Sequence, residues 1–279
     1  MNYALCIMND IVWNPDVVAL SLGSLVIRWY SLCWLIGLIG GYFIVQWLYK
    51  DQKIPQEKFE PLFMYCFIGI LAGARLGHCL FYQPDYFLSS GQHFVEMFLP
   101  IHFLPDGDWK FTGYEGLASH GGTTGLIIAA WIYCSKYKMP WKQLYDNVCI
   151  AVPFCAGMIR MGNLMNSEII GKITDVPWAF IFEQVDKVPR HPGQLYEAIA
   201  YFILFIIGLC LYCSRKKEVG RGFYFGFLLF YIFTFRFFIE FLKADQVDFE
   251  QGMLLNMGQL LSIPFALAGA YMVWRSRKV

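Results

Sequence analysis

The sequence predicts an all-α, polytopic membrane protein with seven transmembrane helices, its N-terminus outside the cell and its C-terminus in the cytoplasm. Of its 279 residues 57% are apolar and only 15% are charged, whereas a soluble domain has about 25% charged residues. The apolar residues gather in seven segments, and the connections between these segments alternate between rich and poor in Lys and Arg. This shortage of charge excludes a disordered protein and a protein that coats nucleic acid, so we expect no nucleic-acid partner.

The seven segments have the length that a bilayer requires, because a hydrocarbon core of about 30 Å needs roughly 20 apolar residues per helix. No internal repeat or low-complexity tract interrupts them, so residues 1–279 are expected to form one integral membrane domain. Residues 83–116, where Phe, Pro and Asp mix, are expected to form an extracytoplasmic loop with an interfacial or re-entrant piece. The expected spans are 30–49, 60–82, 117–134, 144–162, 195–213, 222–242 and 256–274.

The basic residues orient these spans. Four connections hold thirteen Lys and Arg residues (50–59, 135–143, 214–221 and 275–279), and the positive-inside bias puts them in the cytoplasm. The strict alternation favours seven spans over six or eight. The intervening segments hold only six, namely Arg28, Lys110, Lys172, Lys187, Arg190 and Lys243.

Nine cysteines are present, but no CxxC pair has a second pair at zinc spacing. They are expected to be small apolar packing residues without a disulfide framework. Because no H-E-x-x-H motif occurs either, we expect no metal and no cofactor.

A few charged residues fall inside the spans, where each costs at least about 2.5–3.5 kcal/mol at mid-bilayer and therefore usually serves a function. Three arginines and two glutamates stand out, namely Arg75, Arg160, Arg236, Glu197 and Glu240. All lie toward the outer ends of their helices, while the inner halves are almost purely apolar. This asymmetry predicts a polar cavity open to the outer leaflet. It disfavours a transporter, which needs its site near the midplane, and a proton pump.

Structural explanations stay open for several of these groups. Arg236 and Glu240 are four residues apart and can form a simple buried pair on one helix face. Arg75 and His78 are three apart and can do the same. A terminal Tyr30 fits an interfacial belt, and His120 fits a helix cap.

Four stretches are unusual for membrane helices. Residues 120–125 (HGGTTG) open the third span with a histidine, the one side chain that titrates near neutral pH. Residues 160–168 (RMGNLMNSE), followed by Gly171, combine an Arg with two Asn and a Glu, which could hold a phosphate or an ester. The other two are residues 190–197 (RHPGQLYE) and 236–241 (RFFIEF).

With these motifs the sequence resembles the prolipoprotein diacylglyceryl transferase family of bacteria. The resemblance covers almost the whole chain and extends to residues 28–30 (RWY), 73–78 (GARLGH, with Phe81 and Tyr82) and 258–264 (GQLLSIP). Seven motifs thus follow one another in the family's order. Two departures stand out: Ile232 occupies a position where the family often has Tyr, with Tyr231 beside it, and Thr123-Thr124 replace Leu-Ile-like residues.

The resemblance implies an enzyme that moves the diacylglyceryl group of phosphatidylglycerol onto the lipobox cysteine in the signal peptide of a preprolipoprotein. A thioether forms and glycerol 1-phosphate leaves, as the first step of lipoprotein maturation. The protein would be a multi-pass protein of the bacterial inner (cytoplasmic) membrane, with its active site toward the outer leaflet of the lipid bilayer.

Because the nucleophilic thiol belongs to the substrate, the candidate catalytic residues are a base, His120, and two charge-stabilising groups, Arg160 and Arg236. Glu197 and Glu240 are expected to orient the arginines. The candidate substrate-binding residues are Arg160, Asn163, Tyr30, Asn166, Glu168, Gly171, Gln194, Tyr196, Glu197, Glu240, Arg75 and His78.

Two rival functions are open to test. A lipid acyltransferase would want H-x-x-x-x-D, but Gln83, Gly125 and Tyr196 stand at that spacing after the three histidines in or near the spans. A transporter or lipid-binding scaffold could have the same cavity, yet it would give no thioether product.

Overall fold

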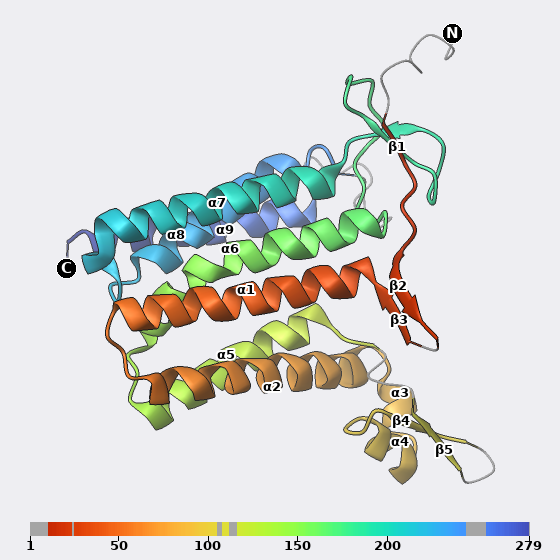
Figure 1. Cartoon of the computed structure of the whole chain (residues 1–279), viewed down its shortest axis with the longest axis horizontal. Coiled ribbons are helices and arrows are strands. Elements are labelled where there is room, and N and C mark those ends of the chain that lie inside the picture. Colours follow the sequence, from red (N-terminus) through yellow and green to blue (C-terminus); the bar gives the residue numbers. More distant parts are fainter. Residues whose placement is uncertain (1–10, 24, 105–107, 112–115, 244–254, 279) are drawn as a thin grey trace. The chain divides into compact units, whose positions relative to one another are not determined.

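The computed structural model describes residues 11–23, 25–104, 108–111, 116–243 and 255–278 (Figure 1). The chain divides into two compact units. The first comprises Met1–Leu48 with Lys142–Val279, and the second comprises Tyr49–Trp141. The single domain expected from the sequence stays a prediction.

Each of the seven expected spans coincides with one helix, and the protein is a mostly helical, multi-pass membrane protein. Five of these helices, α1, α2, α6, α7 and α9, are long and apolar enough to cross a membrane. Crossing by the two shorter helices, α5 and α8, stays a prediction, as does the side on which each terminus lies. The helices are α1 (Trp29–Asp51), α2 (Gln56–Phe81), α5 (Ser119–Tyr137), α6 (Trp141–Met165), α7 (Gly193–Arg215, continued by the 3₁₀ turn η2, Lys216–Glu218), α8 (Phe223–Ile239) and α9 (Met257–Ser276).

Short strands in the connections correct the strictly all-α expectation. In one sheet β1 (Ile11–Trp13) pairs parallel with β6 (Phe180–Phe182), which pairs antiparallel with β7 (Pro189–Arg190). Two further antiparallel pairs are β2 (Val18–Leu22) with β3 (Leu25–Arg28) and β4 (Ile101–Phe103) with β5 (Trp109–Phe111). These strands satisfy backbone groups of segments too short to form their own helices.

The described residues of the predicted loop, 83–104 and 108–111, form a folded module with two short helices, α3 (Pro84–Phe87) and α4 (Gly91–Glu96), and the paired strands β4 and β5. Its centre is the buried carboxylate of Glu96, which accepts hydrogen bonds from the Tyr86 hydroxyl (2.7 Å) and from the backbone N–H of Phe103 (2.7 Å). The module therefore has a polar core of its own.

In the second unit α2 and α5 pack backbone to backbone. A Cβ atom added at Gly121 would lie 2.3 Å from the carbonyl oxygen of Gly73, and one at Gly125 would lie 2.0 Å from that of Gly69. Small residues are what membrane helices use for such close approach. Two glycines of the HGGTTG stretch are thus required by helix packing, and they fix the place where α5 begins.

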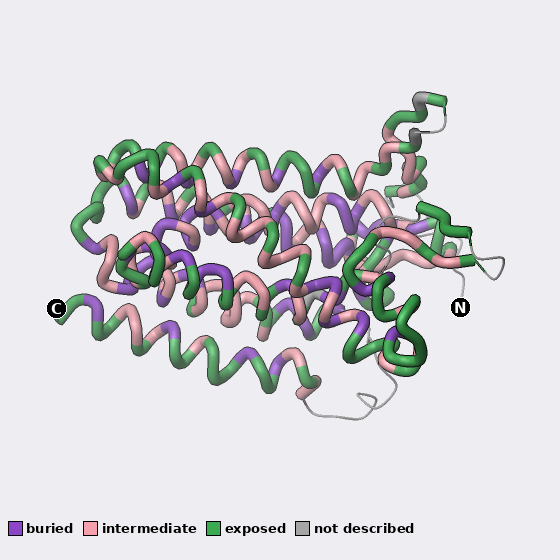
Figure 2. Tube along the Cα trace, turned by 90° about the horizontal axis from the view of Figure 1, so that it is seen from below, coloured by how far each residue is buried: buried purple, intermediate pink, exposed green. Residues whose placement is uncertain are grey.

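In the first unit α6 ends, α7 begins, α8 ends and α9 begins at one common end (Figure 1). At the other end the buried carboxylate of Asp146 on α6 accepts the backbone N–H groups of Gly220 (2.8 Å), Gly222 (2.9 Å) and Phe225 (3.0 Å), which ties down the start of α8. Much of α9 is exposed (Figure 2), and the exposed side chains include Leu261 and Leu267. Apolar faces of this kind suit contact with lipid.

Candidate active site

Five side chains of alternating charge form a continuous chain at the common end of α6, α7 and α8. Arg160 Nε lies 2.7 Å from Glu197 Oε2, and the other oxygen of Glu197 lies 2.9 Å from Lys243 Nζ. Lys243 Nζ also lies 3.3 Å from Glu240 Oε1, which in turn lies 3.5 Å from Arg236 Nε. The structure thus joins Arg160 to Arg236 through two carboxylates and one ammonium group.

The middle of this chain is buried and its two ends are accessible. The side chains of Glu197, Lys243 and Glu240 are 2%, 4% and 8% exposed, whereas those of Arg160 and Arg236 are 23% and 46% exposed. Three cations against two carboxylates leave one net positive charge. A pair of accessible guanidinium groups with a net positive charge can bind a phosphate.

A polar extension continues from Arg160. Its Nη1 donates to Asn163 Oδ1 (3.1 Å), and Asn163 Nδ2 donates to Glu168 Oε2 (3.0 Å). Asn166 Nδ2 donates to the other oxygen of Glu168 (3.1 Å). Ser167 and Ile169 on either side of Glu168 have positive φ values of 55° and 58°. Such strained backbone often accompanies functional sites, and here it directs Glu168 back toward α6.

Gly171 allows three backbone segments to pass close together. A Cβ atom there would lie 2.6 Å from the carbonyl oxygen of His191 and 2.7 Å from that of Leu242. Gly171 also forms a backbone bridge with Lys243. These backbone contacts hold Lys243 beside the two carboxylates, and the carbonyl oxygen of Gly171 also accepts a hydrogen bond from Arg190 Nη1 (3.1 Å).

The start of α7 contributes two more of the predicted residues. Gln194 is fully buried. The Tyr196 hydroxyl accepts a hydrogen bond from Trp178 Nε1 (2.8 Å) and lies 3.2 Å from His191 Nδ1. From the start of α1, Tyr30 lies close enough to Arg160 and Glu168 to interact with both charges. The first unit thus brings together ten of the predicted residues, namely Tyr30, Arg160, Asn163, Asn166, Glu168, Gln194, Tyr196, Glu197, Arg236 and Glu240, on neighbouring helix ends.

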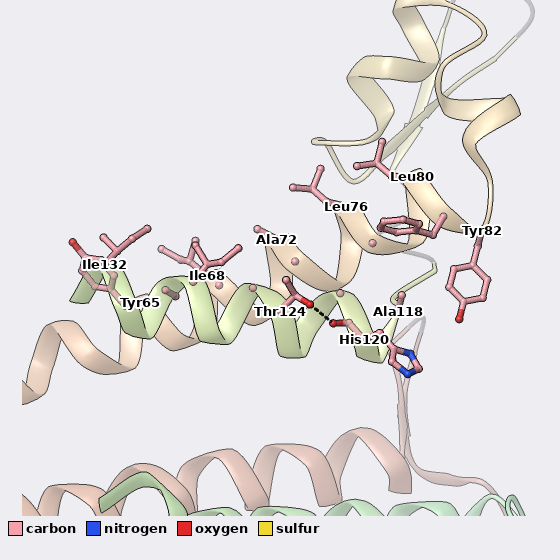
Figure 3. A pocket seen from close by; sticks show the side chains of 18 of the residues that line it. Tyr65, Ile68, Ala72, Leu76, Leu80, Tyr82, Ala118, His120, Thr124 and Ile132 are labelled. Carbon is pink, nitrogen blue, oxygen red and sulfur yellow. Dashed lines mark hydrogen bonds between the residues drawn. The ribbon is translucent and has the colours of Figure 1, made fainter. Parts of the chain in front are cut away.

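His120 belongs to the second unit, where it is exposed at the start of α5. It lines one end of an apolar groove of about 1010 Å³ between α2 and α5, with Tyr82 at the same end and Tyr65 and Ile132 toward the other (Figure 3). The hydrogen bond that Thr124 Oγ1 donates to His120 (3.0 Å) goes to the backbone carbonyl and does not involve the imidazole ring.

Arg75 and His78 have mainly structural contacts. Arg75 is buried, donates to the carbonyl oxygens of Glu96 (2.8 Å) and Met97 (3.4 Å), and lies 4.9 Å from the centre of the Phe87 ring. The His78 ring stacks on Tyr82. These contacts connect α2 to the α3–α4 module, and a role for the two residues in substrate binding stays a prediction.

Two residues at the ion pairs were not predicted from the sequence. Lys243 was grouped with the extracytoplasmic connections, although it follows Glu240 by three residues and Arg236 by seven, the spacing of one helix face. Tyr201, four residues after Glu197 on α7, is buried and lies close enough to Arg160 and Glu197 to interact with both charges. Within the described residues no three His, Cys, Asp or Glu side chains gather as a metal site would require.

Multiple membrane-crossing helices and a buried, net positive ion-pair network define a membrane-embedded protein equipped to handle an anionic group. The chain belongs to the prolipoprotein diacylglyceryl transferase family, whose model matches residues 17–275. It is therefore a transferase.

Three relatives named phosphatidylglycerol–prolipoprotein diacylglyceryl transferase illustrate the match. The chain is 59% identical over 268 residues to the protein from Bacteroides fragilis, covering 96% of both chains. It is 39% identical over 269 residues to that from Tolumonas auensis, covering 95% of this chain and 97% of the relative. It is 38% identical over 288 residues to that from Porphyromonas gingivalis, covering 96% and 95%.

Proposed function

We propose that this enzyme transfers the diacylglyceryl group of phosphatidylglycerol to the lipobox cysteine of a preprolipoprotein, the first step of lipoprotein maturation. The thiol loses its proton and its sulfur attacks the glyceryl carbon that carries the phosphate. The carbon–oxygen bond breaks, a thioether forms, and glycerol 1-phosphate leaves with the electron pair. The family and the names of the relatives support this reaction.

The movement of charge in this reaction explains the need for two arginines. A thiolate and a phosphodiester carry one negative charge each, and after transfer both charges reside on the leaving phosphate monoester. Charge that develops at one place is best stabilised by preorganised donors. Arg160 and Arg236 fill that role in our proposal, because their guanidinium groups end a buried, net positive chain and are themselves accessible. This arrangement is the observation that carries the proposal.

We assign the base to His120. The thiolate is the reactive form of cysteine, whose free pKa is about 8.5, and a neutral imidazole is suited to accept its proton. His120 is exposed at one end of an apolar groove, a setting that suits a base acting beside lipid.

The remaining predicted residues orient or enclose these groups. Glu197 and Glu240 hold the arginines, and Gly171 permits the close backbone approach behind them. Arg75 and His78 position the module that follows α2. The headgroup pocket is formed by Tyr30, Asn163, Asn166, Glu168, Gln194 and Tyr196.

The proposed setting is the bacterial inner membrane, crossed seven times, with the N-terminus outside, the C-terminus in the cytoplasm and the site toward the outer leaflet. The alternation of basic connections supports this orientation. The lipobox peptide and phosphatidylglycerol would then meet at the same membrane face.

A release assay tests the reaction. Purified enzyme in vesicles of phosphatidylglycerol, given a lipobox peptide, should release glycerol phosphate and produce a peptide heavier by one diacylglyceryl group. A peptide with Ser in place of the lipobox Cys should give no transfer. A thermal shift caused by lipid without any thioether would instead support the scaffold, and an acylated peptide would support the acyltransferase.

A further inference from the structure

We infer that Lys243 is a positioning residue for the transfer reaction, which sets the spacing and the net charge of Arg160 and Arg236. This inference rests on the roles proposed above for the two arginines. Its basis is the position of the Lys243 ammonium group, midway in the only described chain of ion pairs that joins Arg160 to Arg236.

Lys243 acts through its neighbours and not on the substrate. Its side chain is 4% exposed, and its Nζ atom contacts Glu197 Oε1 at 2.9 Å and Glu240 Oε1 at 3.3 Å. An ammonium group has three donors, and two of them are directed at carboxylates. A phosphate would have to displace those contacts in a buried site, whereas the arginines at either end are accessible.

The backbone fixes this ammonium group in place. Lys243 forms a backbone bridge with Gly171, and the N–H of Lys172 donates to the carbonyl oxygen of Leu242 at 2.8 Å. The neighbouring Glu240 is held from a further side by Asn256 Nδ2 at 3.3 Å. The long lysine side chain is therefore held at its backbone end as well as at its ammonium group.

The ammonium group also decides the charge at the site. With it, the chain of direct ion pairs has three cations against two carboxylates and keeps one net positive charge, while Glu168 is linked to Arg160 through Asn163. Without it, the charges of the two carboxylates would balance those of the two arginines. The carboxylates would also lose the cation between them, and a buried charge that loses its partner is strongly unfavourable. The guanidinium groups would then turn toward the carboxylates and away from the leaving phosphate.

The test compares kcat and KM for phosphatidylglycerol in vesicles, together with the thermal unfolding midpoint, for Lys243→Met, Lys243→Arg and a matched control. Lys187→Met is the control, since Lys187 is an exposed lysine in a loop of the same unit. We expect Lys243→Met to lower kcat by about 10²-fold, as misplaced catalytic groups do, with KM changed less than about threefold. Lys243→Arg should recover most of the rate, and Lys187→Met should match wild type.

A double variant keeps the test decisive if Lys243→Met does not fold. Lys243→Met combined with Glu240→Gln removes one charge of each sign and preserves the net positive charge. We expect the double variant to fold. If Lys243→Met also folds, the double variant should have the higher kcat of the two. If Lys243→Met does not fold, the kcat of the double variant should lie within about 10²-fold of wild type. A folded double variant without activity would overturn the inference.

The remaining outcomes distinguish a failure of this inference from a failure of the proposed site. Wild-type kcat in Lys243→Met overturns the role of Lys243, and so does a folded Lys243→Arg variant as inactive as Lys243→Met. If Arg160→Ala and Arg236→Ala lose turnover in the same assay, the proposed site stands even when the Lys243 inference fails. If both arginine variants keep wild-type turnover, the site assignment itself is wrong.

Discussion

Arg160 Nε lies 2.7 Å from Glu197 Oε2, an ion pair between α6 and α7 in which the carboxylate is almost fully buried. The same guanidinium group donates through Nη1 to Asn163 at 3.1 Å. One arginine thus engages two partners in different directions while remaining partly accessible. Only a planar group with several fixed donors can do this.

Replacement of Arg160 by Lys should therefore be nearly as harmful as replacement by Ala. A lysine keeps the charge but has a single ammonium centre, which cannot hold Glu197 and Asn163 in the same geometry and still reach a phosphate. We expect a loss of about 10²-fold in kcat for Arg160→Lys. Turnover in the vesicle assay measures it, and a variant within threefold of wild type would show that charge alone suffices.

The packing of α2 against α5 predicts a sharp contrast between two adjacent glycines. Gly121→Ala would put a Cβ atom 2.3 Å from the carbonyl oxygen of Gly73, whereas the nearest atom to a Cβ at Gly122 is 3.4 Å away. Overpacking of this kind costs about 1–3 kcal/mol. We expect Gly121→Ala to lower the thermal unfolding midpoint in detergent.

Gly122→Ala is the matched control and should leave that midpoint within the error of measurement. Equal effects of the two substitutions would contradict the described packing of α2 on α5.

Asp146 predicts a stability effect remote from the site. Fourteen residues separate it from Arg160 on α6, about 21 Å along the helix. Asp146→Ala would leave the N–H groups of Gly220, Gly222 and Phe225 without this acceptor, and the loss at the buried Gly222 alone costs about 1–3 kcal/mol. We expect a markedly lower unfolding midpoint but near-normal kcat in the protein that remains folded at low temperature. An unchanged midpoint would argue against this contact.

Glu96 predicts a pH dependence of the α3–α4 module. Burial raises the pKa of this carboxyl group, but hydrogen bonds from Phe103 N–H and the Tyr86 hydroxyl, together with His102, outweigh it and hold the pKa below the usual 4.5. A group whose pKa is lowered by folding stabilises the fold above its unfolded pKa. That contribution is lost as the pH falls through the folded value.

Glu96→Gln should therefore loosen the module at pH 7, while the difference from wild type should shrink as the pH falls below about 4. Hydrogen exchange of residues 84–104, compared between the two proteins at each pH, measures this. A difference that grows on acidification would reverse the assigned sign.

The helices could be predicted from the sequence because long apolar runs leave few alternatives in a bilayer. The short sheets could not, since three-residue strands such as β1 and β6 carry little pattern of their own and pair across most of the chain. The fold of the α3–α4 module was missed for a similar reason, because it depends on the one buried carboxylate of Glu96.

The candidate site was predicted in part. Charged residues are conspicuous in an apolar span, and so the Arg160–Glu197 and Arg236–Glu240 pairs could be predicted from the sequence. Lys243 was not, because its burial depends on the backbone bridge to Gly171 and not on local composition.

The central claim is that the guanidinium groups stabilise the negative charge gathered on the leaving phosphate. Its most direct test is the single-turnover rate of thioether formation by Arg236→Ala, followed by mass spectrometry of the lipobox peptide in phosphatidylglycerol vesicles. Arg236 is 46% exposed, and because exposed ion pairs contribute little to stability the unfolding midpoint should stay close to wild type. We predict a rate about 10²–10³-fold below wild type. A folded Arg236→Ala enzyme that forms the thioether at the wild-type rate would contradict the claim.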